Sequence, residues 1–260
     1  MANRYTFGDG TLAAERLALL ARVFEPASAP LVRSAVPPGA DVVLDLGCGP
    51  GATTRMIARE CRPRLALGLD ASPRFVAAAR EGVEAEGGDG GDGGARDGAV
   101  AFAVHDVTAV PFPRAPVDAV YARFLLAHLA DPLGLVDRWR TQLRPGGVLV
   151  LDEIEDMTVP GGTLRAYEDL VTALVAAEGG TMCAGPLLAP LGGTCVEHPV
   201  DAATAARLYA MNLATWGPDA VARGLADEPG LDELAAGLAA VQEAPGRATV
   251  LWTLRHVVLR

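Results

Sequence analysis

The chain has 260 residues, half of them apolar, and a formal net charge of −10, with no lysine among its 22 basic residues. This size and composition support a substantial core without disulfides or metals. The acidity disfavours nucleic acid, whose phosphates are bound by clustered Lys and Arg, and the absence of lysine excludes a P-loop and Schiff-base chemistry.

No apolar run reaches the roughly 18 residues of a membrane span, and residues 1–10 lack the apolar core of a signal peptide. The four cysteines form no CxxC pair and have no histidine nearby at zinc spacing. Scattered cysteines of this kind are typical of reduced thiols. We therefore expect a soluble cytoplasmic protein with no membrane partner.

The first expected element is a helix over residues 11–24, where apolar residues recur at helical spacing. Pro26 and Pro30 are expected to end it, because proline removes a helical hydrogen bond and clashes with the preceding turn. A second short helix would follow up to Val36. Residues 1–36 thus form an N-terminal helical segment.

The central part of the chain alternates between strands and helices. Strands are expected over residues 41–46, 65–69, 100–104, 117–121 and 148–151. Helices are expected over 53–61, after Ser72 as N-cap with Pro73 in the first turn, and over 133–143 before the turn at 144–147. Residues 87–98 are Gly- and Asp-rich and predict a surface insertion. Strands that alternate with helices predict a doubly wound parallel sheet.

After residue 152 the pattern becomes mainly helical. Helices are expected over 163–177, 202–216, 218–226 and 231–243, and strands over 195–199 and 249–259. This helical stretch is longer than a crossover requires. We interpret it as a cap over the carboxyl edge of the sheet, where ligands of such folds bind.

Residues 44–51 read Leu-Asp-Leu-Gly-Cys-Gly-Pro-Gly, a glycine-rich turn between the first strand and the first helix. Such a turn lets the backbone approach a ligand and aims helix N-terminal amides at it. Gly47, Gly49 and Ala52 also fit the dinucleotide pattern, so the glycines alone do not choose the cofactor. A carboxylate at Asp45 would repel a pyrophosphate but not the amino group and sulfonium of S-adenosylmethionine.

With Asp45, Gly47, Gly49 and Gly51, this loop resembles the first motif of the class I S-adenosylmethionine-dependent methyltransferases, D/E-x-G-x-G-x-G. The resemblance extends over residues 40–152 and includes the stretches 117–120, 128–132 and 143–149. It is closest to the bacterial small-molecule type, and it implies S-adenosylmethionine as cofactor.

Acidic residues after the next two strands support the resemblance. Asp70 is placed to accept both ribose hydroxyls, a feature that NAD enzymes share. In the family, the acid at the place of Asp106 receives the adenine amino group. The implied cofactor contacts are Tyr5, Asp45, Gly47, Cys48, Gly49, Gly51, Asp70, Ala71, His105, Asp106, Val107 and Arg123. As alternatives, Asp45 could cap the loop by accepting its amides, and Asp106 could be an ordinary turn residue.

The catalytic candidates follow from topology. Arg123, just past the fourth strand, is either a ligand of the cofactor or of a substrate carboxylate, or a helix-start residue in a surface ion pair. His128, expected in a helix, is either a general base or a structural histidine. Glu153 belongs to the acidic run 152–156 after the fifth strand and is expected to contact substrate or act as a base, with the other acids solvated.

The N-terminus resembles the lid of bacterial small-molecule methyltransferases in Tyr5-Thr6-Phe7-Gly8 and Glu15-Arg16-Leu17. In those enzymes a tyrosine reaches over the cofactor; the alternative for Tyr5 is a disordered terminus. The chain lacks the paired acidic and Asn ligands of metal-dependent catechol methyltransferases, so no metal is expected. It also lacks the Asn/Asp-Pro-Pro-Tyr tetrad of many DNA methyltransferases, reading Tyr-Ala-Arg-Phe at 121–124.

The sequence therefore predicts an α/β fold: one domain with a doubly wound, mostly parallel, seven-stranded Rossmann-like sheet. Its expected parts are a lid (1–36), a cofactor-binding core (37–152), a helical substrate cap with a short strand (153–247) and a final strand (248–260). The expected function is methyl transfer to an O, N or C nucleophile of a small molecule or short peptide in specialised-metabolite biosynthesis, in a possible homodimer. The alternatives are a non-methylating S-adenosylmethionine enzyme and a nicotinamide-dependent oxidoreductase.

Overall fold

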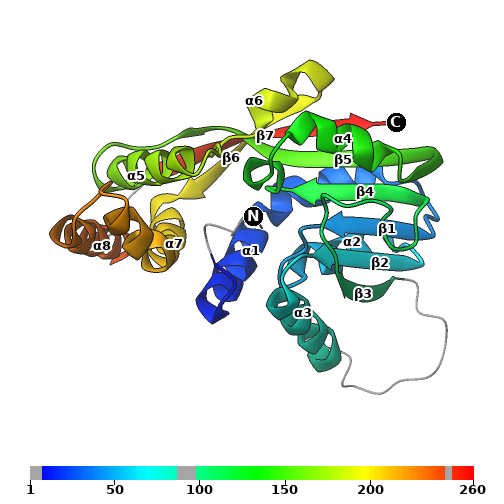
Figure 1. The fold of residues 1–260 in the computed structure, drawn as a ribbon, viewed down its shortest axis with the longest axis horizontal. Coiled ribbons are helices and arrows are strands. Elements are labelled where there is room, and N and C mark those ends of the chain that lie inside the picture. The colour runs from blue at the N-terminus through cyan, green and yellow to red at the C-terminus, as the bar shows by residue number, and fades with distance from the viewer. Residues whose placement is uncertain (1–7, 87–97, 244–247) are drawn as a thin grey trace.

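The computed structural model describes residues 8–86, 98–243 and 248–260, so the predictions for Tyr5 and for most of the 87–98 insertion lie outside it. Within these residues, seven strands form one sheet in the order β3-β2-β1-β4-β5-β7-β6 (Figure 1). The strands are β1 (Val42–Leu46), β2 (Leu65–Asp70), β3 (Ala99–Val104), β4 (Val117–Arg123), β5 (Leu143–Thr158), β6 (Thr194–Asp201) and β7 (Thr249–Leu259).

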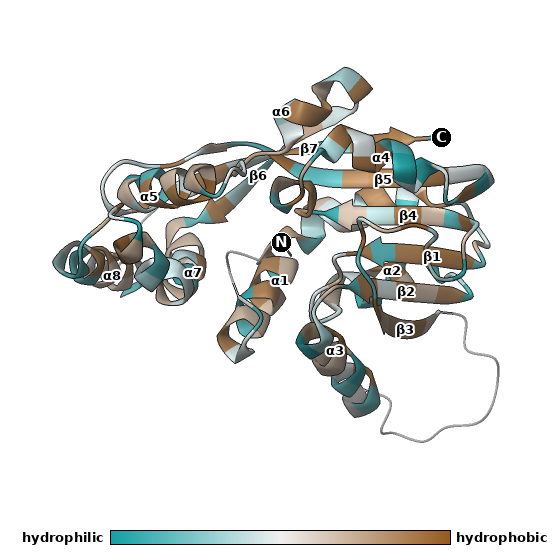
Figure 2. Ribbon diagram, in the orientation of Figure 1, coloured by the Kyte–Doolittle hydropathy of each residue, from teal (hydrophilic) through white to brown (hydrophobic). Residues whose placement is uncertain are grey.

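Strands β1 to β5 run parallel, whereas β7 pairs antiparallel with both β5 and β6. Helices cover both faces, which confirms the predicted doubly wound α/β fold. One face carries α1 (Thr11–Ala35), α2 (Ala52–Cys61) and α3 (Pro73–Glu86), and the other carries α4 (Pro132–Arg140) and the short α6 (Gly185–Leu188). The central strands are apolar because both faces are buried (Figure 2).

The helices α5 (Thr163–Ala177), α7 (Ala202–Ala222) and α8 (Glu228–Glu243) pack around a second core on the extended ends of β5, β7 and β6 (Figure 1). Phe24 of α1 connects this core to the rest of the molecule. Its ring lies 4.8 Å from that of Trp252 and 5.0 Å from that of Phe124. We call α5, α7, α8 and the strand ends that they cover the helical end; it meets the central sheet at α1.

Two helices are longer than expected, because each continues through proline. The helix α1 runs without a break through Pro26 and Pro30, and α7 continues through Pro218 to Ala222. All three proline side chains are exposed, while neighbours such as Phe24 and Trp216 are fully buried. Packing of the buried face thus outweighs the loss of single hydrogen bonds on the solvent side.

The fifth strand is longer than expected at both ends. It begins at Leu143, includes residues 144–147 as an irregular stretch opposite β4, and continues to Thr158. Its extension pairs with β7 as far as Leu251. The strand is longer than predicted because this pairing with a segment distant in the sequence cannot be seen in the local pattern. The acidic run 152–156, expected after the strand, therefore lies within it, across the predicted core–cap boundary.

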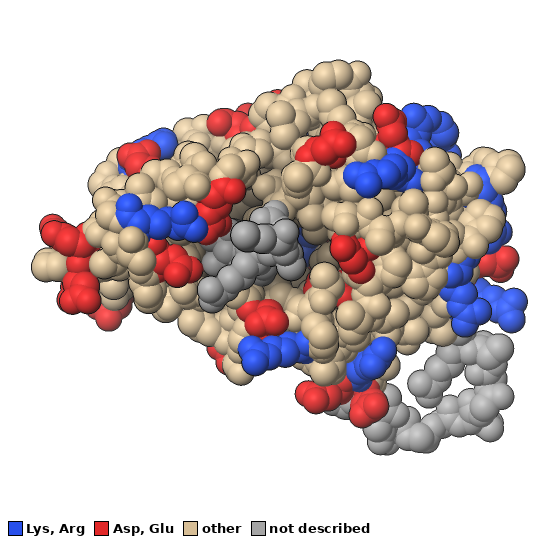
Figure 3. Space-filling model, in the orientation of Figure 1, with Lys and Arg blue, Asp and Glu red and all other residues tan. Residues whose placement is uncertain are grey.

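In the part of the chain that is described, no helix combines the length and the apolar character needed to cross a bilayer. The face drawn in Figure 3 shows acidic side chains gathered at the helical end and basic and acidic groups mixed elsewhere, without a broad basic surface.

Candidate active site

The expected site residues converge at the carboxyl edge of the parallel strands. Strand pairing sets Leu46 beside Leu69 and Ala122, so the residues that follow β1, β2 and β4 meet at one edge. Arg123 pairs in turn with Asp152 of β5. This is the edge at which ligands of open α/β sheets bind.

The glycine loop adopts backbone conformations that other residues rarely take. Gly47, Gly49 and Gly51 have φ values of 66°, 52° and 84°. A Cβ atom on Gly51 would lie 2.5 Å from Phe102 Cζ, and one on Gly47 would lie 2.8 Å from Leu125 Cδ1. The loop is thus held close to β3 on one side and to the turn after β4 on the other.

Asp45 is buried beneath this loop, and its Oδ2 accepts hydrogen bonds from the hydroxyls of Thr53 and Thr54, both at 2.6 Å. Burial raises its pKa to about 6, although the two hydroxyls and Arg123 oppose the rise. The carboxyl therefore fixes the first turn of α2. The donors to Asp45 are hydroxyls of α2, whereas the capping alternative named amides of the loop.

Asp70 ends β2 and organises the loop from the side. Its Oδ2 accepts a hydrogen bond from the Gly49 amide at 2.9 Å, and its Oδ1 accepts one from the Ser72 amide at 2.8 Å. Each carboxylate oxygen has two lone pairs, so each keeps one acceptor position. A pair of vicinal hydroxyls matches that remaining capacity. Ala71, the next residue, is exposed at the same edge.

The end of β3 lies next to Asp70, whose carbonyl accepts a hydrogen bond from the His105 amide at 2.9 Å. Asp106 is exposed, and its Oδ1 accepts hydrogen bonds from the amide and hydroxyl of Thr108, which lower its pKa. Val107 is buried, and its carbonyl accepts from Trp139 Nε1 at 2.8 Å. Asp106 thus forms a turn and still presents a carboxylate at the edge.

Arg123 is half-buried at the end of β4, and its Nη1 donates a hydrogen bond to Ser28 Oγ of α1 at 3.2 Å. The same Ser28 hydroxyl donates to Asp152 Oδ2 at 2.6 Å, and the Tyr121 hydroxyl donates to that oxygen at 2.9 Å. No helix begins at Arg123, so the helix-start alternative is wrong. Sequence reasoning missed Ser28, Tyr121 and His256 as members of this buried cluster, since no local pattern marks them.

Glu153 points to the opposite face of the sheet from Asp152, because side chains alternate along a strand. It is 1% exposed, and its Oε1 accepts hydrogen bonds from the Leu125 and Leu126 amides at 2.8 and 2.9 Å. Burial raises its pKa to about 8. Glu153 therefore holds the turn that follows β4. Asp152 is also fully buried, so the expectation that the other acids of the run are solvated is wrong for this residue, whereas Asp156 is exposed.

His128 lies at the end of a single 3-10 turn, Leu126–His128, and not in a longer helix. Burial, together with the charge of Arg16 on α1, lowers its pKa to about 4. His128 is therefore neutral at pH 7. Arg16 itself is 5% exposed, and it also opposes the rise that burial causes in the pKa of Tyr167 on α5. Its guanidinium thus lies among α1, this turn and the helical end.

The first turns of α1 lie between the helical end and the glycine loop. A Cβ atom on Gly8 would lie 3.1 Å from Thr215 of α7, and the Ser72 hydroxyl donates a hydrogen bond to Asp9 at 2.9 Å. Farther along the helix, Leu17 Cδ1 lies 3.2 Å from the Cβ position of Gly49. The segment from Gly8 to Leu17, which includes the first turns of α1, therefore contacts both sides of the site.

Comparison with known proteins identifies the family. A family profile described as a methyltransferase domain matches residues 44–151. A trans-aconitate 2-methyltransferase of Variovorax paradoxus is 32% identical over 225 residues, which cover 83% of this chain and 79% of that protein. This chain belongs to the S-adenosylmethionine-dependent methyltransferases. A second methyltransferase of that name, from Methylobacterium radiotolerans, is 34% identical over 119 residues, but this match spans only 40% of its length.

Solved methyltransferases share the fold. A methyltransferase of Geobacter sulfurreducens in complex with S-adenosylhomocysteine superposes with a TM-score of 0.52 at 22% identity, covering 90% of this chain and 89% of that one. A methyltransferase from Anaeromyxobacter dehalogenans described as a putative type II enzyme gives 0.56 at 19% identity, with 90% and 95% covered. These likenesses concern the fold.

The cofactor of this methyltransferase family fits the residues at the sheet edge. The glycines at positive φ let the loop backbone pack closely between β3 and the turn after β4, and Asp70 keeps two acceptor positions that suit ribose hydroxyls. Asp106 offers an exposed carboxylate one strand farther along. Among the described residues, no group of three or more His, Cys, Asp and Glu is arranged to hold a metal ion.

Proposed function

We propose that this methyltransferase transfers the methyl group of S-adenosylmethionine to a small molecule held between the glycine loop and the helices α5 and α7. The observation that carries the proposal is the position of the segment from Gly8 to Leu17: the two residues before the N-cap of α1 contact Thr215 of α7 and Ser72 before α3, and Leu17 of α1 contacts the glycine loop. A chain segment that crosses the mouth of the site limits access to acceptors smaller than a folded protein. A tailoring step in specialised metabolism agrees with this arrangement.

The roles of the residues follow from their contacts. Gly47 to Gly51, Asp70 and Asp106 would hold the cofactor, which supplies a methyl group already activated by the positive charge on sulfur. Glu153 keeps the turn at residues 125–126 in place beneath the acceptor through two amide hydrogen bonds. Correct placement of the acceptor supplies much of the rate in such a displacement.

The charges around the site favour an acceptor that is already ionised, such as a carboxylate. Arg16 and Arg123 place two cations near the turn after β4, and a neutral His128 with a pKa of about 4 is a weak base. A carboxylate needs no base, because it is deprotonated at working pH. The names of the relatives, trans-aconitate 2-methyltransferases, support the same acceptor chemistry.

Product analysis tests the proposal. The purified chain is incubated with S-adenosylmethionine and a panel of small carboxylic acids, amines and phenols, trans-aconitate included, and S-adenosylhomocysteine is quantified by chromatography. We expect stoichiometric formation of a methylated product with at least one carboxylic acid. Tight cofactor binding without S-adenosylhomocysteine on any acceptor would instead favour a non-methylating reaction.

A variant tests the carboxylate preference. We expect R123Q to raise KM for the carboxylate acceptor about tenfold or more, because the variant loses one charge-assisted hydrogen bond. The Kd for S-adenosylhomocysteine should be unchanged. R140Q removes an equal charge from the exposed end of α4 and serves as the control. An unchanged KM in R123Q would contradict the role given to this arginine.

A further inference from the structure

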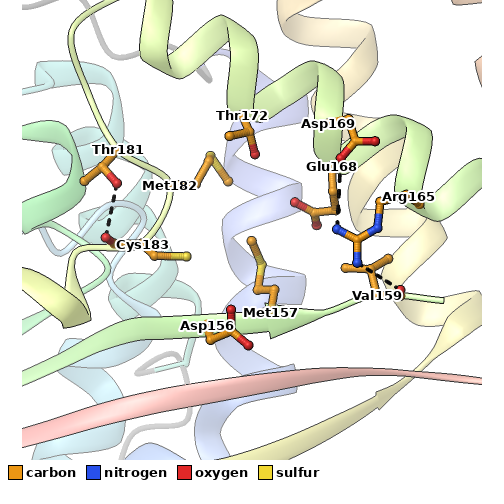
Figure 4. A pocket seen from close by; sticks show the side chains of 10 residues that line it. All are labelled: Asp156, Met157, Val159, Arg165, Glu168, Asp169, Thr172, Thr181, Met182 and Cys183. Carbon is orange, nitrogen blue, oxygen red and sulfur yellow. Dashed lines mark hydrogen bonds and ion pairs between the residues drawn. The ribbon is translucent and has the colours of Figure 1, made fainter. Parts of the chain in front are cut away.

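A cavity of about 220 Å³ lies between the far end of β5 and α5 (Figure 4), and no residue of the glycine loop lines it. Asp156 and Met157 of β5 form one wall, and Arg165, Glu168, Asp169 and Thr172 line it from α5. Its volume is below the roughly 300 Å³ of sites that enclose drug-sized molecules, so it suits one head group of a ligand. None of the roles described above uses it.

Glu168 lies at the buried side of this cavity. The residue is 4% exposed, and its Oε2 has no hydrogen-bond partner within the described residues. Figure 4 shows its carboxyl group directed toward the space bounded by Met157, Met182 and Thr172. The Tyr209 hydroxyl, which likewise forms no hydrogen bond of standard geometry within the described residues, lies close enough to Glu168 to oppose in part the rise of its pKa to about 7 that burial causes. A buried carboxyl oxygen without a partner leaves an acceptor position open to a donor or a cation from outside the protein.

The remaining charges leave the cavity acidic. Arg165 Nη2 donates to the Val159 carbonyl at 3.2 Å, and Arg165 Nη1 lies 4.0 Å from Asp169 Oδ1. This arginine is therefore engaged at the rim by Asp169. Asp156 forms no ion pair with the described residues, so it and the ionised form of Glu168 are the acidic groups of the cavity that no cation of the protein neutralises.

The other walls suit an organic cation. Met157, Met182 and Cys183 contribute polarizable sulfur and apolar surface, and such side chains adapt their shape to a bound group. A metal ion of the calcium or magnesium type prefers a shell of oxygen ligands. An alkylammonium group, in contrast, combines a positive charge with apolar methyl or methylene surface, which matches both parts of the wall.

We propose that this cavity binds the ammonium group of a small organic cation. It anchors that group at the carboxylate of Glu168, with Asp156 adding negative charge at the opening. This ammonium site lies in the helical end and shares no lining residue with the glycine loop.

The cavity is placed to anchor an acceptor of the proposed methyl transfer, and this second step rests on the proposed function. Asp156 lies three residues beyond Glu153 on β5, a distance of about 10 Å along a strand. The loop that carries Thr181 to Cys183 also approaches the turn after β4, where a Cβ atom on Gly180 would lie 3.5 Å from the Ala127 carbonyl. An acceptor with an ammonium group at one end would thus reach the methyl position with its other end.

Binding of choline chloride to the full chain, without cofactor, tests the proposal by calorimetry. We expect saturable binding, and about tenfold weaker binding of 3,3-dimethylbutan-1-ol, which has the same shape without the charge. The variant E168Q keeps the shape of the side chain and is expected to weaken choline at least about tenfold. E197Q on the exposed edge strand β6 carries the same change in charge and should bind choline as the wild type does.

Equal affinity for choline and its neutral analogue, or an unchanged affinity in E168Q, would overturn the proposal. The comparison of choline with the neutral analogue needs no variant and remains decisive if E168Q fails to fold. Binding of S-adenosylhomocysteine, measured in parallel on the same protein, separates the two proposals. Cofactor binding without choline binding contradicts only the ammonium site, and choline binding without cofactor binding contradicts only the methyl transfer.

Discussion

Asp152 of β5 and His256 of β7 face each other in antiparallel register, with His256 Nε2 3.4 Å from Asp152 Oδ1. Both side chains are buried, and the Ser28 and Tyr121 hydroxyls donate to the other oxygen of Asp152. Burial alone would raise the pKa of Asp152, but His256, Arg123 and Ser28 hold it below its usual value. This ionised carboxylate joins α1, β4 and β7 beneath the proposed acceptor site.

Removal of this carboxylate is expected to destabilise the protein. D152A leaves the Ser28 and Tyr121 hydroxyls without their acceptor, and each buried group left unsatisfied costs about 1–3 kcal/mol. We expect a loss of about 3 kcal/mol in the free energy of unfolding, measured by urea denaturation. S28A removes one donor and leaves Tyr121 in place, so it should cost only about 1 kcal/mol. Equal losses in the two variants would contradict the shared role of Asp152.

The raised pKa of Glu153 predicts a pH dependence of stability. Its folded pKa is about 8 and its unfolded value is 4.5, so between these values the folded state binds more protons and stability falls as pH rises. E153Q keeps an oxygen for the Leu125 and Leu126 amides and removes the titration. We expect E153Q to gain more than about 1 kcal/mol over the wild type between pH 5.5 and pH 8.5.

Urea denaturation of both proteins at the two pH values measures this gain. Every other titrating group is common to the pair, so its contribution cancels. The interpretation of Glu153 fails if the stability difference between E153Q and the wild type is the same at both pH values.

Gly51 of the glycine loop and Gly146 of β5 offer a matched pair of substitutions. Gly51 and Gly146 have similar φ values of 84° and 79°, but a Cβ atom meets Phe102 at Gly51 and nothing within 4 Å at Gly146. We expect G146A to cost about 1 kcal/mol from backbone strain and to leave the affinity for S-adenosylhomocysteine unchanged. G51A adds overpacking of about 1–3 kcal/mol and should weaken that affinity at least about tenfold. Calorimetry and thermal unfolding of both variants measure these effects, and identical behaviour would count against the loop as the cofactor site.

Asp70 is expected to matter for the cofactor through its remaining acceptor positions. D70N converts one acceptor oxygen into a donor, so it loses a charge-assisted hydrogen bond to a hydroxyl worth about 1.5–3 kcal/mol. The Kd for S-adenosylhomocysteine should rise about tenfold or more, as measured by calorimetry. E197Q, far from the loop, provides the control for the loss of one negative charge. An unchanged Kd in D70N would remove Asp70 from the cofactor site.

Much of the fold could be predicted because local patterns coincide with the three-dimensional structure. Helix α5 and strand β7 have the bounds expected from periodicity, and Ser72 caps α3 through its hydroxyl, which accepts from the Phe75 amide at 3.3 Å. The glycine loop could be recognised because positive φ and close packing demand glycine at fixed positions.

The rest depends on partners far away in the sequence. Asp152 and Glu153 are buried because they bind His256, Ser28 and the amides of residues 125–126, all of which are distant in the sequence. The local sequence does not show these partners, so it predicts an exposed edge for both residues. The unbroken course of α1 through its prolines likewise reflects packing of its other face. Local patterns thus indicate elements and the cofactor loop, whereas the buried polar cluster requires the tertiary structure.

Calorimetric titration of the full chain with S-adenosylhomocysteine tests most directly the claim that the loop at residues 44–51 is a methyl-donor site. We expect one saturable binding event per chain at sub-millimolar ligand, and weaker binding in G51A and D70N but not in G146A. The absence of binding up to millimolar ligand, or equal affinities in all four proteins, would contradict it.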